Sequence, residues 1–324
     1  MRTPLGALAV LAGVVILTGC ASGAGTTPAA VEDSAVAAFA IDENFADPDV
    51  VATDDGYLAF ATNVPGFNVL MASSPDLETW SVVREDRLPE LPAWTASGKV
   101  WAPEVSARAD GGFVLYFTSE DTASGRQCIG VATSGPDALF TAASDEPLVC
   151  PLDEGGAIDA STFTDDDGTR HLVWKNDGNC CGLDTWIQTA PLADDGLSLT
   201  GPPVRLVKQD LVWEGSLIEA PVIVKHADAY VLFYSANDYG GDDYAMGSAT
   251  ATALTGPYTK SDEPILSTSS SGGRYLGPGG QDVVSTPEGD RIVFHSWDES
   301  YAYRGMHVAP LEWDADLPRV VLPD

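Results

Sequence analysis

The chain has 324 residues, of which 44% are hydrophobic and 20% are charged, so its composition is globular rather than disordered or fibrous. This length accommodates one large domain or two ordinary ones. The formal net charge is -32, from 48 acidic and 16 basic side chains, so the surface repels phosphate backbones and nucleic acid is a poor candidate for a partner. A neutral ligand such as a glycan meets no such repulsion.

The N-terminus has the pattern of an export signal. Arg2 precedes an apolar run at 5–17, which is too short to span a bilayer comfortably. The run Leu17-Thr18-Gly19-Cys20 resembles a bacterial lipobox, which predicts a lipoprotein signal peptide at 1–19 and lipidation of Cys20. The alternative is an ordinary secretory signal with a chance cysteine. Residues 20–42 are expected to form a flexible tether, so the protein would lie outside the cytoplasm and be held to the cell membrane by acyl chains alone.

Four cysteines remain after Cys20, and an even number in an exported protein favours disulfides. Cys128 and Cys150 flank one short connection and are expected to bridge adjacent strands, which typically adds about 2–4 kcal/mol. Cys180 and Cys181 are neighbours, and the sequence leaves open whether they form a vicinal disulfide or stay reduced. No CxxC spacing or histidine cluster accompanies them, so a zinc site is not expected.

From residue 43 onward, the chain repeats one pattern about every 55 to 62 residues. Each unit opens with an acidic or amide residue near a proline or small residue, at 47–51, 102–105, 158–162, 218–222 and 280–284. A polar turn follows in each unit, at 54–56, 110–112, 165–168, 226–228 and 288–290, and two further β-rich runs come after it. This order indicates hairpins and meanders, and no segment has a sustained helical period.

Five self-similar β units predict an all-β protein, a five-bladed β-propeller over residues 43–324. A β-sandwich or two stacked β domains are the alternatives, and neither explains five matched turns. The first strand of each propeller blade lines the central channel, so the acids in these strands should converge. Glu104, Asp159 and Glu219 hold comparable places in their strands, and Asp47 stands at the start of its own. The plainer interpretation is strand-end acids facing bulk water, but clustered carboxylates are electrostatically costly and usually serve a function.

Four motifs follow one another at blade spacing, at 46–50, 101–104, 158–161 and 218–221. Together they resemble those of glycoside hydrolase family 43. Ala46-Asp47-Pro48-Asp49-Val50 is similar to the family's opening motif, whose first Asp is the general base. Trp101-Ala102-Pro103-Glu104 resembles the second-blade motif. Ile158-Asp159-Ala160-Ser161 matches the third-blade motif, whose Asp orients the general acid and tunes its pKa. Ile218-Glu219-Ala220-Pro221 matches the fourth-blade motif, which carries the general acid. The runs at 294–298 and 310–313 resemble the closing blade, so the likeness spans residues 44–316.

The resemblance implies an inverting glycosidase that releases a terminal pentose, α-L-arabinofuranose or β-D-xylose, from plant cell-wall polysaccharides or their oligosaccharides. In this chemistry Glu219 protonates the leaving oxygen while Asp47 activates a water on the opposite side, with the two carboxyl groups about 6.5–9.5 Å apart. An endo-arabinanase is an alternative, and it would need an open groove. A surface glycan-binding propeller without catalysis is another, and so is a related five-bladed family that acts on fructans. We expect a monomer with a carbohydrate as its only soluble partner.

Further candidates surround the three acids. Trp101 and Trp94 are both candidates for sugar-stacking surfaces at the channel mouth, and packing explains either equally well. Glu104 contacts the substrate or caps its strand. Arg304 aligns with an arginine that the family often places in the active site, and a surface salt bridge is its alternative. His295 is a channel-side candidate, against a structural role. Asn176 and Asp177 are expected to shape the pocket.

The fifth blade departs from the family pattern. Many members have a Gly-Pro-Gly-His run there, with the His facing the channel and helping to hold a metal ion or water cluster. Here the run is Gly277-Pro278-Gly279-Gly280-Gln281, so Gln281 is expected to take the place of the His. The departure argues against a structural Ca²⁺, while a central water or sodium ion remains compatible with it. No cofactor is expected to be required.

Overall fold

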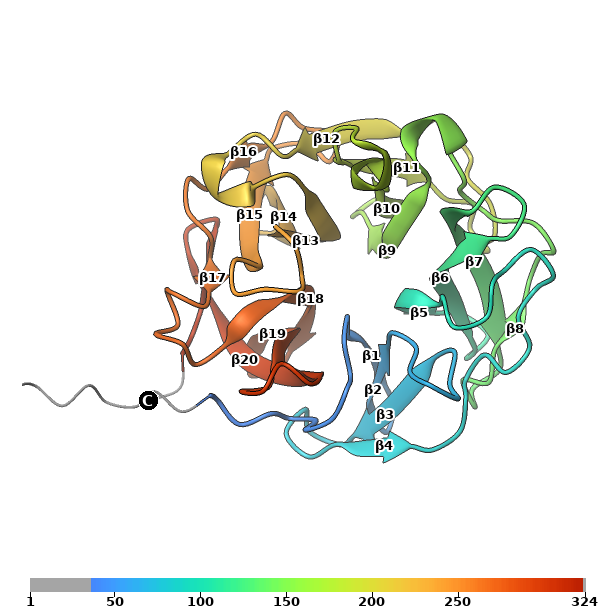
Figure 1. The fold of residues 1–324 in the computed structure, drawn as a ribbon, viewed down its shortest axis with the longest axis horizontal. Helices are drawn as coiled ribbons and strands as arrows, with labels where there is room; N and C mark the ends of the chain where they lie inside the picture. The colour runs from blue at the N-terminus through green and yellow to red at the C-terminus, as the bar shows by residue number, and fades with distance from the viewer. Residues whose placement is uncertain (1–35, 323–324) are drawn as a thin grey trace, which may run out of the picture. The chain divides into compact units, whose positions relative to one another are not determined.

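Five antiparallel β-sheets make up the part of the chain that the structure, a computed structural model, describes, residues 36–322 (Figure 1). The sheets follow one another in chain order around a centre, as the blades of a five-bladed β-propeller (Figure 1). The predicted fold class is therefore confirmed, and the sandwich and two-domain alternatives are wrong. The predicted signal peptide and Cys20 lie outside the described residues.

Each blade is a meander in which the chain runs outward from the centre. Blade 1 contains β1 (Asp49–Thr53), β2 (Gly56–Ala61), β3 (Leu70–Ser74) and β4 (Ser81–Val83). Blade 2 contains β5 (Trp101–Ala107), β6 (Phe113–Asp121), β7 (Arg126–Ser134) and β8 (Thr141–Ala142). Blade 3 contains β9 (Ala157–Thr164), β10 (Arg170–Asn176), β11 (Trp186–Pro191) and β12 (Val204–Lys208).

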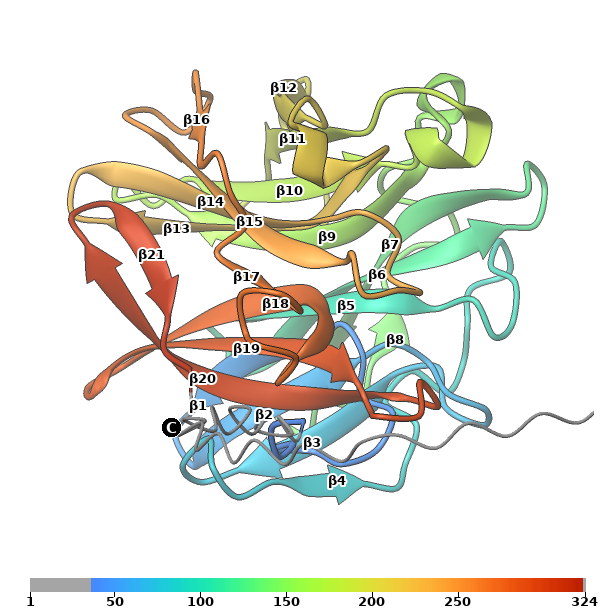
Figure 2. The ribbon, with the colours of Figure 1, turned by 60° about the vertical axis from the view of Figure 1, so that its left-hand side comes forward.

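Blade 4 contains β13 (Ile218–His226), β14 (Ala229–Ala236), β15 (Ala245–Ala251) and β16 (Thr259–Lys260), and β17 (Leu266–Ser267) also pairs with β15. Blade 5 contains β18 (Leu276–Thr286), β19 (Gly289–Trp297), β20 (Arg304–Asp314) and β21 (Leu317–Val320), a twisted sheet in Figure 2. Three short 3₁₀ helices lie in the loops: η1 (Leu152–Glu154), η2 (Gly178–Cys181) and η3 (Val212–Glu214). The repeat predicted three runs per unit and missed the outermost strands, because several are only two residues long and carry no apolar run.

The hydrophobic core is divided among the blade interfaces. Five buried clusters each join two consecutive blades, and the fifth joins blade 5 to blade 1. The second strand of a blade faces both neighbours, which is why every residue of β14 is buried. This explains the runs of aromatic and β-branched residues that follow each turn in the sequence, since a strand covered on both faces needs no polar side.

The ordered part of the chain begins earlier than predicted. Ala37 N–H donates to Arg274 O at 2.8 Å, and Ala40 N–H donates to Met306 O at 2.8 Å. The Phe39 ring lies on that of His307, with centroids 4.4 Å apart. The predicted tether of residues 20–42 is therefore too long at its C-terminal end, where the chain packs on blade 5. Ala37 and Ala40 resemble linker residues in composition, but their backbone N–H groups are paired.

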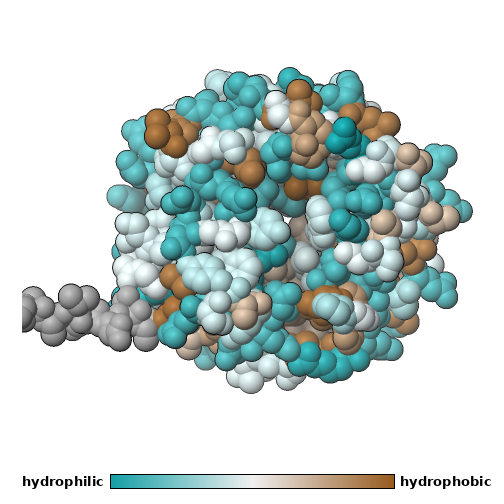
Figure 3. All heavy atoms as spheres, in the orientation of Figure 1, coloured by the Kyte–Doolittle hydropathy of each residue, from teal (hydrophilic) through white to brown (hydrophobic). Residues whose placement is uncertain are grey.

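Both cysteine pairs are disulfides: Cys128 is bonded to Cys150, as predicted, and Cys180 to Cys181. Hydrophilic residues cover most of the face in Figure 3, as expected for a chain with a net charge of -32. Within residues 36–322, no helix has the length and apolarity needed to cross a membrane.

Candidate active site

One backbone position is repeated in all five blades, at or just before the first strand. It has a left-handed conformation, with φ between 40° and 57°, at Asp47, Ala102, Asp159, Ala220 and Gly280. Asp and Gly tolerate this region, whereas alanine is strained in it. Asp47 and Asp159 are therefore equivalent residues, while Glu104 lies two positions after Ala102 and Glu219 one before Ala220. The prediction that Glu104, Asp159 and Glu219 occupy comparable places was wrong, because it matched the motifs by residue type rather than by backbone geometry.

A second repeated position holds the first in place. It lies near the end of each second strand, and the strand pairing makes five residues equivalent there, namely Thr62, Thr118, Lys175, Ser235 and His295. Four of them accept the backbone N–H of the left-handed residue in the next blade. Thr62 bonds Ala102 at 2.9 Å, and Thr118 bonds Asp159 at 3.2 Å. Ser235 bonds Gly280 at 3.0 Å, and His295 Nδ1 bonds Asp47 at 3.0 Å, so the pattern runs across the closure of the ring.

Lys175 is the exception, because an ammonium group has no lone pair with which to accept a hydrogen bond. The N–H of Ala220 instead donates to Asp159 Oδ2 at 2.9 Å, which fixes the carboxyl group of Asp159. The Lys175 side chain is fully buried, and its Nζ lies 3.3 Å from Glu219 Oε2 and 3.7 Å from Asp177 Oδ1. Because of this one departure from the repeat, the Ala220 N–H binds Asp159 and the Lys175 ammonium lies beside Glu219.

The three predicted catalytic acids line one pocket of about 410 Å³. Every blade contributes to its wall, which consists of Asp47, Thr62, Trp101, Ile158, Asp159, Lys175, Asp177, Asn179, Cys180, Leu217, Glu219, Asp238, Tyr239, Tyr244 and Arg304. The volume is in the range of pockets that hold small molecules. The structure thus brings Asp47, Asp159 and Glu219 together, as the sequence predicted.

Asp47 lies in an environment that keeps it ionised. Burial by itself would raise the pKa of Asp47, but the positive charge of Arg304 and a hydrogen bond from Thr62 outweigh it and lower that pKa below its usual value. Arg304 Nη1 lies 3.5 Å from Oδ1, and Thr62 Oγ1 donates to Oδ2 at 2.6 Å. Burial, with help from Arg304, lowers the pKa of His295 to about 3, so its ring is neutral and Nδ1 is free to accept the Asp47 N–H.

Asp159 and Glu219 form a coupled acidic pair. Burial, followed by repulsion from Glu219, raises the pKa of Asp159 to about 8, while Lys175 opposes the increase. Burial and the nearby Glu219 thus retain one proton on the Asp159–Glu219 pair at neutral pH. Glu219 accepts a hydrogen bond from the Tyr244 hydroxyl at Oε1, at 2.9 Å, and its Oε2 faces Lys175. Protons of interacting carboxyls belong to the pair, so the pair stores a proton at neutral pH.

The predicted substrate-binding residues are divided between two regions. Trp101 and Arg304 line the pocket, and Arg304 also lies over the Tyr239 ring, 4.6 Å from its centroid. Glu104 and Gln281 instead line a smaller cavity of about 40 Å³, which shares Asp47 and Asp159 with the pocket, and His295 is fully buried behind Asp47. The positions of these three side chains do not support direct contact with a substrate in the pocket. Trp94 is a core residue that stacks on Phe117 at 6.1 Å.

The small cavity contains a second acidic group that joins the blades. Asp282 Oδ2 accepts the Val50 N–H at 2.9 Å, and Asp49 Oδ2 accepts the Val105 N–H at 2.9 Å. Glu104 Oε1 accepts the Thr162 N–H at 3.0 Å, so Glu104 caps a strand of the neighbouring blade. Burial raises the pKa of all three carboxyls, and repulsion from Glu104 adds to this at Asp49 and Asp282.

Replacing Asp282 with Asn should reduce the loss of stability that the protein shows as the pH rises. The pKa of Asp282 is about 7 in the folded chain, above its ordinary value of 3.8. The folded state therefore binds this proton more tightly than the unfolded state, and the associated stability is lost between those two values as pH increases. The effect has an upper limit of about 4 kcal/mol, from 1.36 kcal/mol per pKa unit.

Melting temperatures measured across this pH range test the Asp282 prediction. Asp282→Asn should show a flatter profile than the wild type, by a few °C. Asp228→Asn, in the exposed turn between β13 and β14, is the matched control and should follow the wild type. Parallel profiles for Asp282→Asn and the wild type would contradict the assignment.

The fifth blade offers no replacement for the missing family histidine. A side chain at Gly280 would begin 2.6 Å from the His295 ring and 2.7 Å from Asp47 Oδ1, so the space is already filled. Gln281 donates to Ala220 O and accepts from Ser235, which makes it a structural bridge between blades. Within residues 36–322, no cluster of three or more His, Cys, Asp and Glu side chains is arranged to hold a metal ion.

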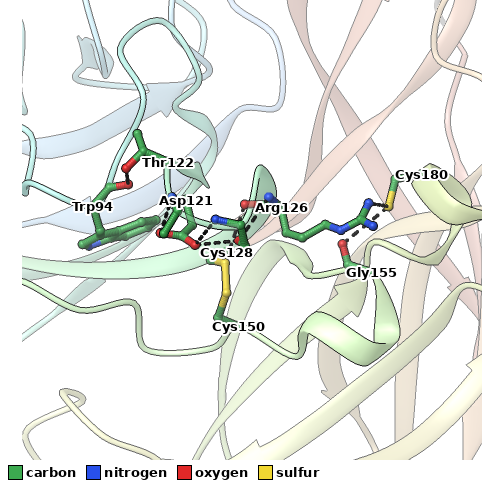
Figure 4. Close-up of a disulfide and its surroundings, with 10 residues drawn as sticks. Trp94, Asp121, Thr122, Arg126, Cys128, Cys150, Gly155 and Cys180 are labelled. Carbon is green, nitrogen blue, oxygen red and sulfur yellow. Dashed lines mark hydrogen bonds between the residues drawn. A yellow bond between two sulfur atoms is a disulfide. The ribbon is translucent and has the colours of Figure 1, made fainter.

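The loop after β10 supplies pocket residues that lie outside the four sequence motifs. Asn176 anchors it by donating to Glu154 O at 2.9 Å and Asp184 O at 3.1 Å. Asp177 and Cys180 then line the pocket, as the sequence suggested for Asp177. Figure 4 shows Arg126 reaching from β7 to Cys180, 3.1 Å from its sulfur.

Sequence reasoning missed Lys175 and Tyr244 altogether. Lys175 follows the apolar residues of β10, and Tyr244 lies just before β15, so both resemble the ends of core strands. A signal for Lys175 does exist. It is a lysine at a repeat position where the other blades have Thr, Thr, Ser and His.

A five-bladed propeller with an acidic pocket lined by every blade defines the structural class of this protein. Within that class, the model of glycosyl hydrolases family 43 matches residues 40–317. The chain belongs to this family, as the four sequence motifs indicated.

Characterised relatives and solved structures agree with this assignment. The chain is 27% identical to an extracellular exo-α-(1→5)-L-arabinofuranosidase of Streptomyces avermitilis, over 90% of this chain and 62% of that protein. It is 25% identical to extracellular endo-α-(1→5)-L-arabinanase 1 of Bacillus subtilis, over 88% of this chain and 90% of that protein. A crystal structure of a thermostable family-43 glycoside hydrolase superposes with a TM-score of 0.76 at 27% identity, covering 89% of this chain and 95% of that one. The chain spans about three fifths of the length of the first curated relatives it matches.

Proposed function

We propose that this protein is an inverting glycosidase that releases terminal pentose units, α-L-arabinofuranose or β-D-xylose, from plant cell-wall polysaccharides or oligosaccharides. The observation that carries the proposal is the meeting of Asp47, Asp159 and Glu219 in one pocket of about 410 Å³. One ionised and one proton-bearing carboxyl are what hydrolysis of a glycosidic bond requires. No step needs a cofactor, because the acid, the base and water account for all the bonds changed.

Asp47 is the general base. Its carboxylate removes a proton from a water molecule, whose oxygen attacks the anomeric carbon from the face opposite the leaving group. Arg304 and Thr62 hold the carboxylate and favour its ionised form. A neutral His295 fixes the backbone of Asp47 from behind without adding a competing charge.

Glu219 is the general acid. It gives its proton to the glycosidic oxygen while the bond from that oxygen to the anomeric carbon breaks, and the electron pair stays with the leaving oxygen. Asp159 keeps a proton available to the pair and is itself oriented by the Ala220 N–H. After product release the pair takes up one proton from solvent, which restores the starting state.

The shape of the pocket favours removal of terminal units. Its wall includes residues from all five blades, which would allow the pocket to enclose a terminal sugar. Trp101 and Tyr239 lie on the wall and provide aromatic surfaces for the apolar face of a sugar ring. The exo-acting relative from Streptomyces avermitilis supports the same preference.

A substrate panel tests the proposal. Nitrophenyl α-L-arabinofuranoside and β-D-xyloside, linear arabinan and arabino- and xylo-oligosaccharides should show turnover with monosaccharide as the first product. Proton NMR of the initial product should show the inverted anomer. Internal cleavage of arabinan would support the endo-acting alternative instead. Binding of oligosaccharides without any turnover would identify a glycan-binding propeller.

The pH profile of kcat/KM should have an alkaline limb near pH 8. Activity falls there because the acidic pair loses its proton as the pH rises through the pKa of Asp159, about 8. The acid limb should lie below the ordinary Asp pKa of 3.8, since Asp47 stays ionised down to that point. In Asp159→Asn, the alkaline limb should move to lower pH, because mutual repulsion no longer retains the proton beside Lys175. An unchanged alkaline limb in this variant would contradict the shared-proton scheme.

We further propose that the protein acts outside the cytoplasm, attached to the membrane by lipid on Cys20. The extracellular relatives from Streptomyces avermitilis and Bacillus subtilis support the compartment. In a bacterial host fed labelled palmitate, the wild type should carry the label in the membrane fraction. Cys20→Ser should lose the label and leave that fraction. Label retained by the variant would contradict lipidation at Cys20.

A further inference from the structure

Lys175 occupies a position that has another task in the rest of the propeller. In the other four blades, the equivalent residue accepts the N–H of the left-handed residue in the next blade. A lysine cannot do this, and the lost bond is replaced by one to Asp159. The substitution gives up a bond used four times elsewhere and places a buried cation among carboxyl groups. A buried charge is costly unless it is paired, so its partners indicate what it does.

The carboxyl group nearest to the Lys175 ammonium belongs to Glu219, the proposed general acid. Glu219 Oε2 is 3.3 Å from Nζ, and Asp177 Oδ1 is 3.7 Å away. Lys175 also interacts electrostatically with Asp159, and Tyr244 bonds the far oxygen of Glu219. Arg126, which acts on Asp177 from β7, adds a second positive charge nearby. No part of the Lys175 side chain reaches solvent, so water screens these interactions little.

We propose that Lys175 is a positioning residue that stabilises the carboxylate formed on Glu219 when this residue gives its proton to the leaving oxygen. The inference rests on the proposed function of Glu219. While Glu219 holds the proton that it transfers, Lys175 faces a neutral acid, and after the transfer Lys175 faces a full negative charge. Its attraction is therefore larger late in the reaction than early, which is the condition for accelerating the step. Lys175 neither gives nor takes a proton, so the proton balance of the reaction is unchanged.

Lys175 has a second, unfavourable effect in the resting enzyme, and this effect explains why Asp159 is needed. A cation beside Glu219 favours early loss of the proton, and a second carboxyl that resists ionisation offsets this. The two groups are joined by the same exception in the repeat, since Lys175 frees the Ala220 N–H that orients Asp159. Lys175 and Asp159 thus act as an opposed pair around one acid.

Lys175→Met and Lys175→Arg test the inference on the best pentoside of the panel. Lys175→Met should lower kcat by about 10²-fold for an alkyl or sugar leaving group and much less for a dinitrophenyl leaving group, which needs no proton. Its alkaline limb should move to higher pH by about one unit, because the cation no longer favours the ionised pair. Lys175→Arg retains the charge and should keep the wild-type limb. Lys225→Met, a lysine that pairs with Asp165 and Asp166 outside the pocket, is the matched control and should match the wild type throughout.

The outcomes separate the inference from the proposed function. A wild type that turns over no member of the panel overturns the proposed function and, with it, this inference. An active wild type whose Lys175→Met variant loses the same factor for every leaving group, with an unmoved alkaline limb, overturns the inference alone and leaves Lys175 a structural role. Should Lys175→Met not fold, Lys175→Gln, which is polar and neutral, replaces it with the same expected shift.

Discussion

Replacing Asp47 with Asn should reduce kcat/KM on the best pentoside substrate by about 10²–10⁴-fold, the range for removal of a general base. Asparagine has the shape of aspartate and tolerates the left-handed backbone at this position, where φ is 54°. Its amide oxygen can still accept the Thr62 hydroxyl, so the variant should fold. What it loses is the ability to take a proton from water.

A second Asp47 variant and a control sharpen this prediction. In Asp47→Gly, added azide should restore part of the rate, because azide needs no base, and the sugar azide formed should have the inverted configuration. Asp282→Asn removes a carboxyl of the small cavity and should keep its rate near pH 6 within about threefold, being outside the pocket. A rate for Asp47→Asn close to that of the wild type would show that Asp47 is not the general base.

Glu219→Gln should lose about 10²–10⁴-fold in kcat/KM on oligosaccharides, whose leaving oxygen must be protonated. Gln can still accept the Tyr244 hydroxyl at the Oε1 position. On a dinitrophenyl pentoside the loss should be within about tenfold, since that leaving group departs as a stable anion. The contrast between the two substrates is the measurement that identifies a general acid.

Two results would contradict the role of Glu219. One is an equal loss on both substrates, which would indicate damage to binding or to the fold. The other is retention of full activity on oligosaccharides. Because Gln places an amide group beside the Lys175 ammonium, Glu219→Ala is a useful second variant that removes this unfavourable contact.

The fold was predictable because its evidence is repeated. Each blade opens with a similar short motif, turns at a short segment that contains Asp, and returns through an apolar strand. Five such units are compatible with few architectures. The gathering of Asp47, Asp159 and Glu219 followed from the same repeat. The segment around Phe39 was not recognised as part of the domain, because only its pairing with β20 distinguishes it from a linker.

The charge states and partners were harder to predict, because they depend on distance and burial. The sequence indicates that Asp159 belongs beside the acid, but the proton on Asp159 arises from burial and from Glu219 across the blade boundary. Glu104 and Gln281 stand in motifs next to catalytic residues, yet they point into another cavity. Lys175 looked like the end of a core strand until the register aligned it with Thr62, Thr118, Ser235 and His295.

The five left-handed positions also have a consequence for protein engineering. Asp47, Ala102, Asp159 and Ala220 share one backbone conformation, so an aspartate at either alanine would need no change of main-chain path and would relieve a strained alanine. A single substitution can therefore add a carboxylate to the second or the fourth blade. The fifth position is closed to such a substitution, because the imidazole of His295 already occupies the volume that a side chain at Gly280 would need.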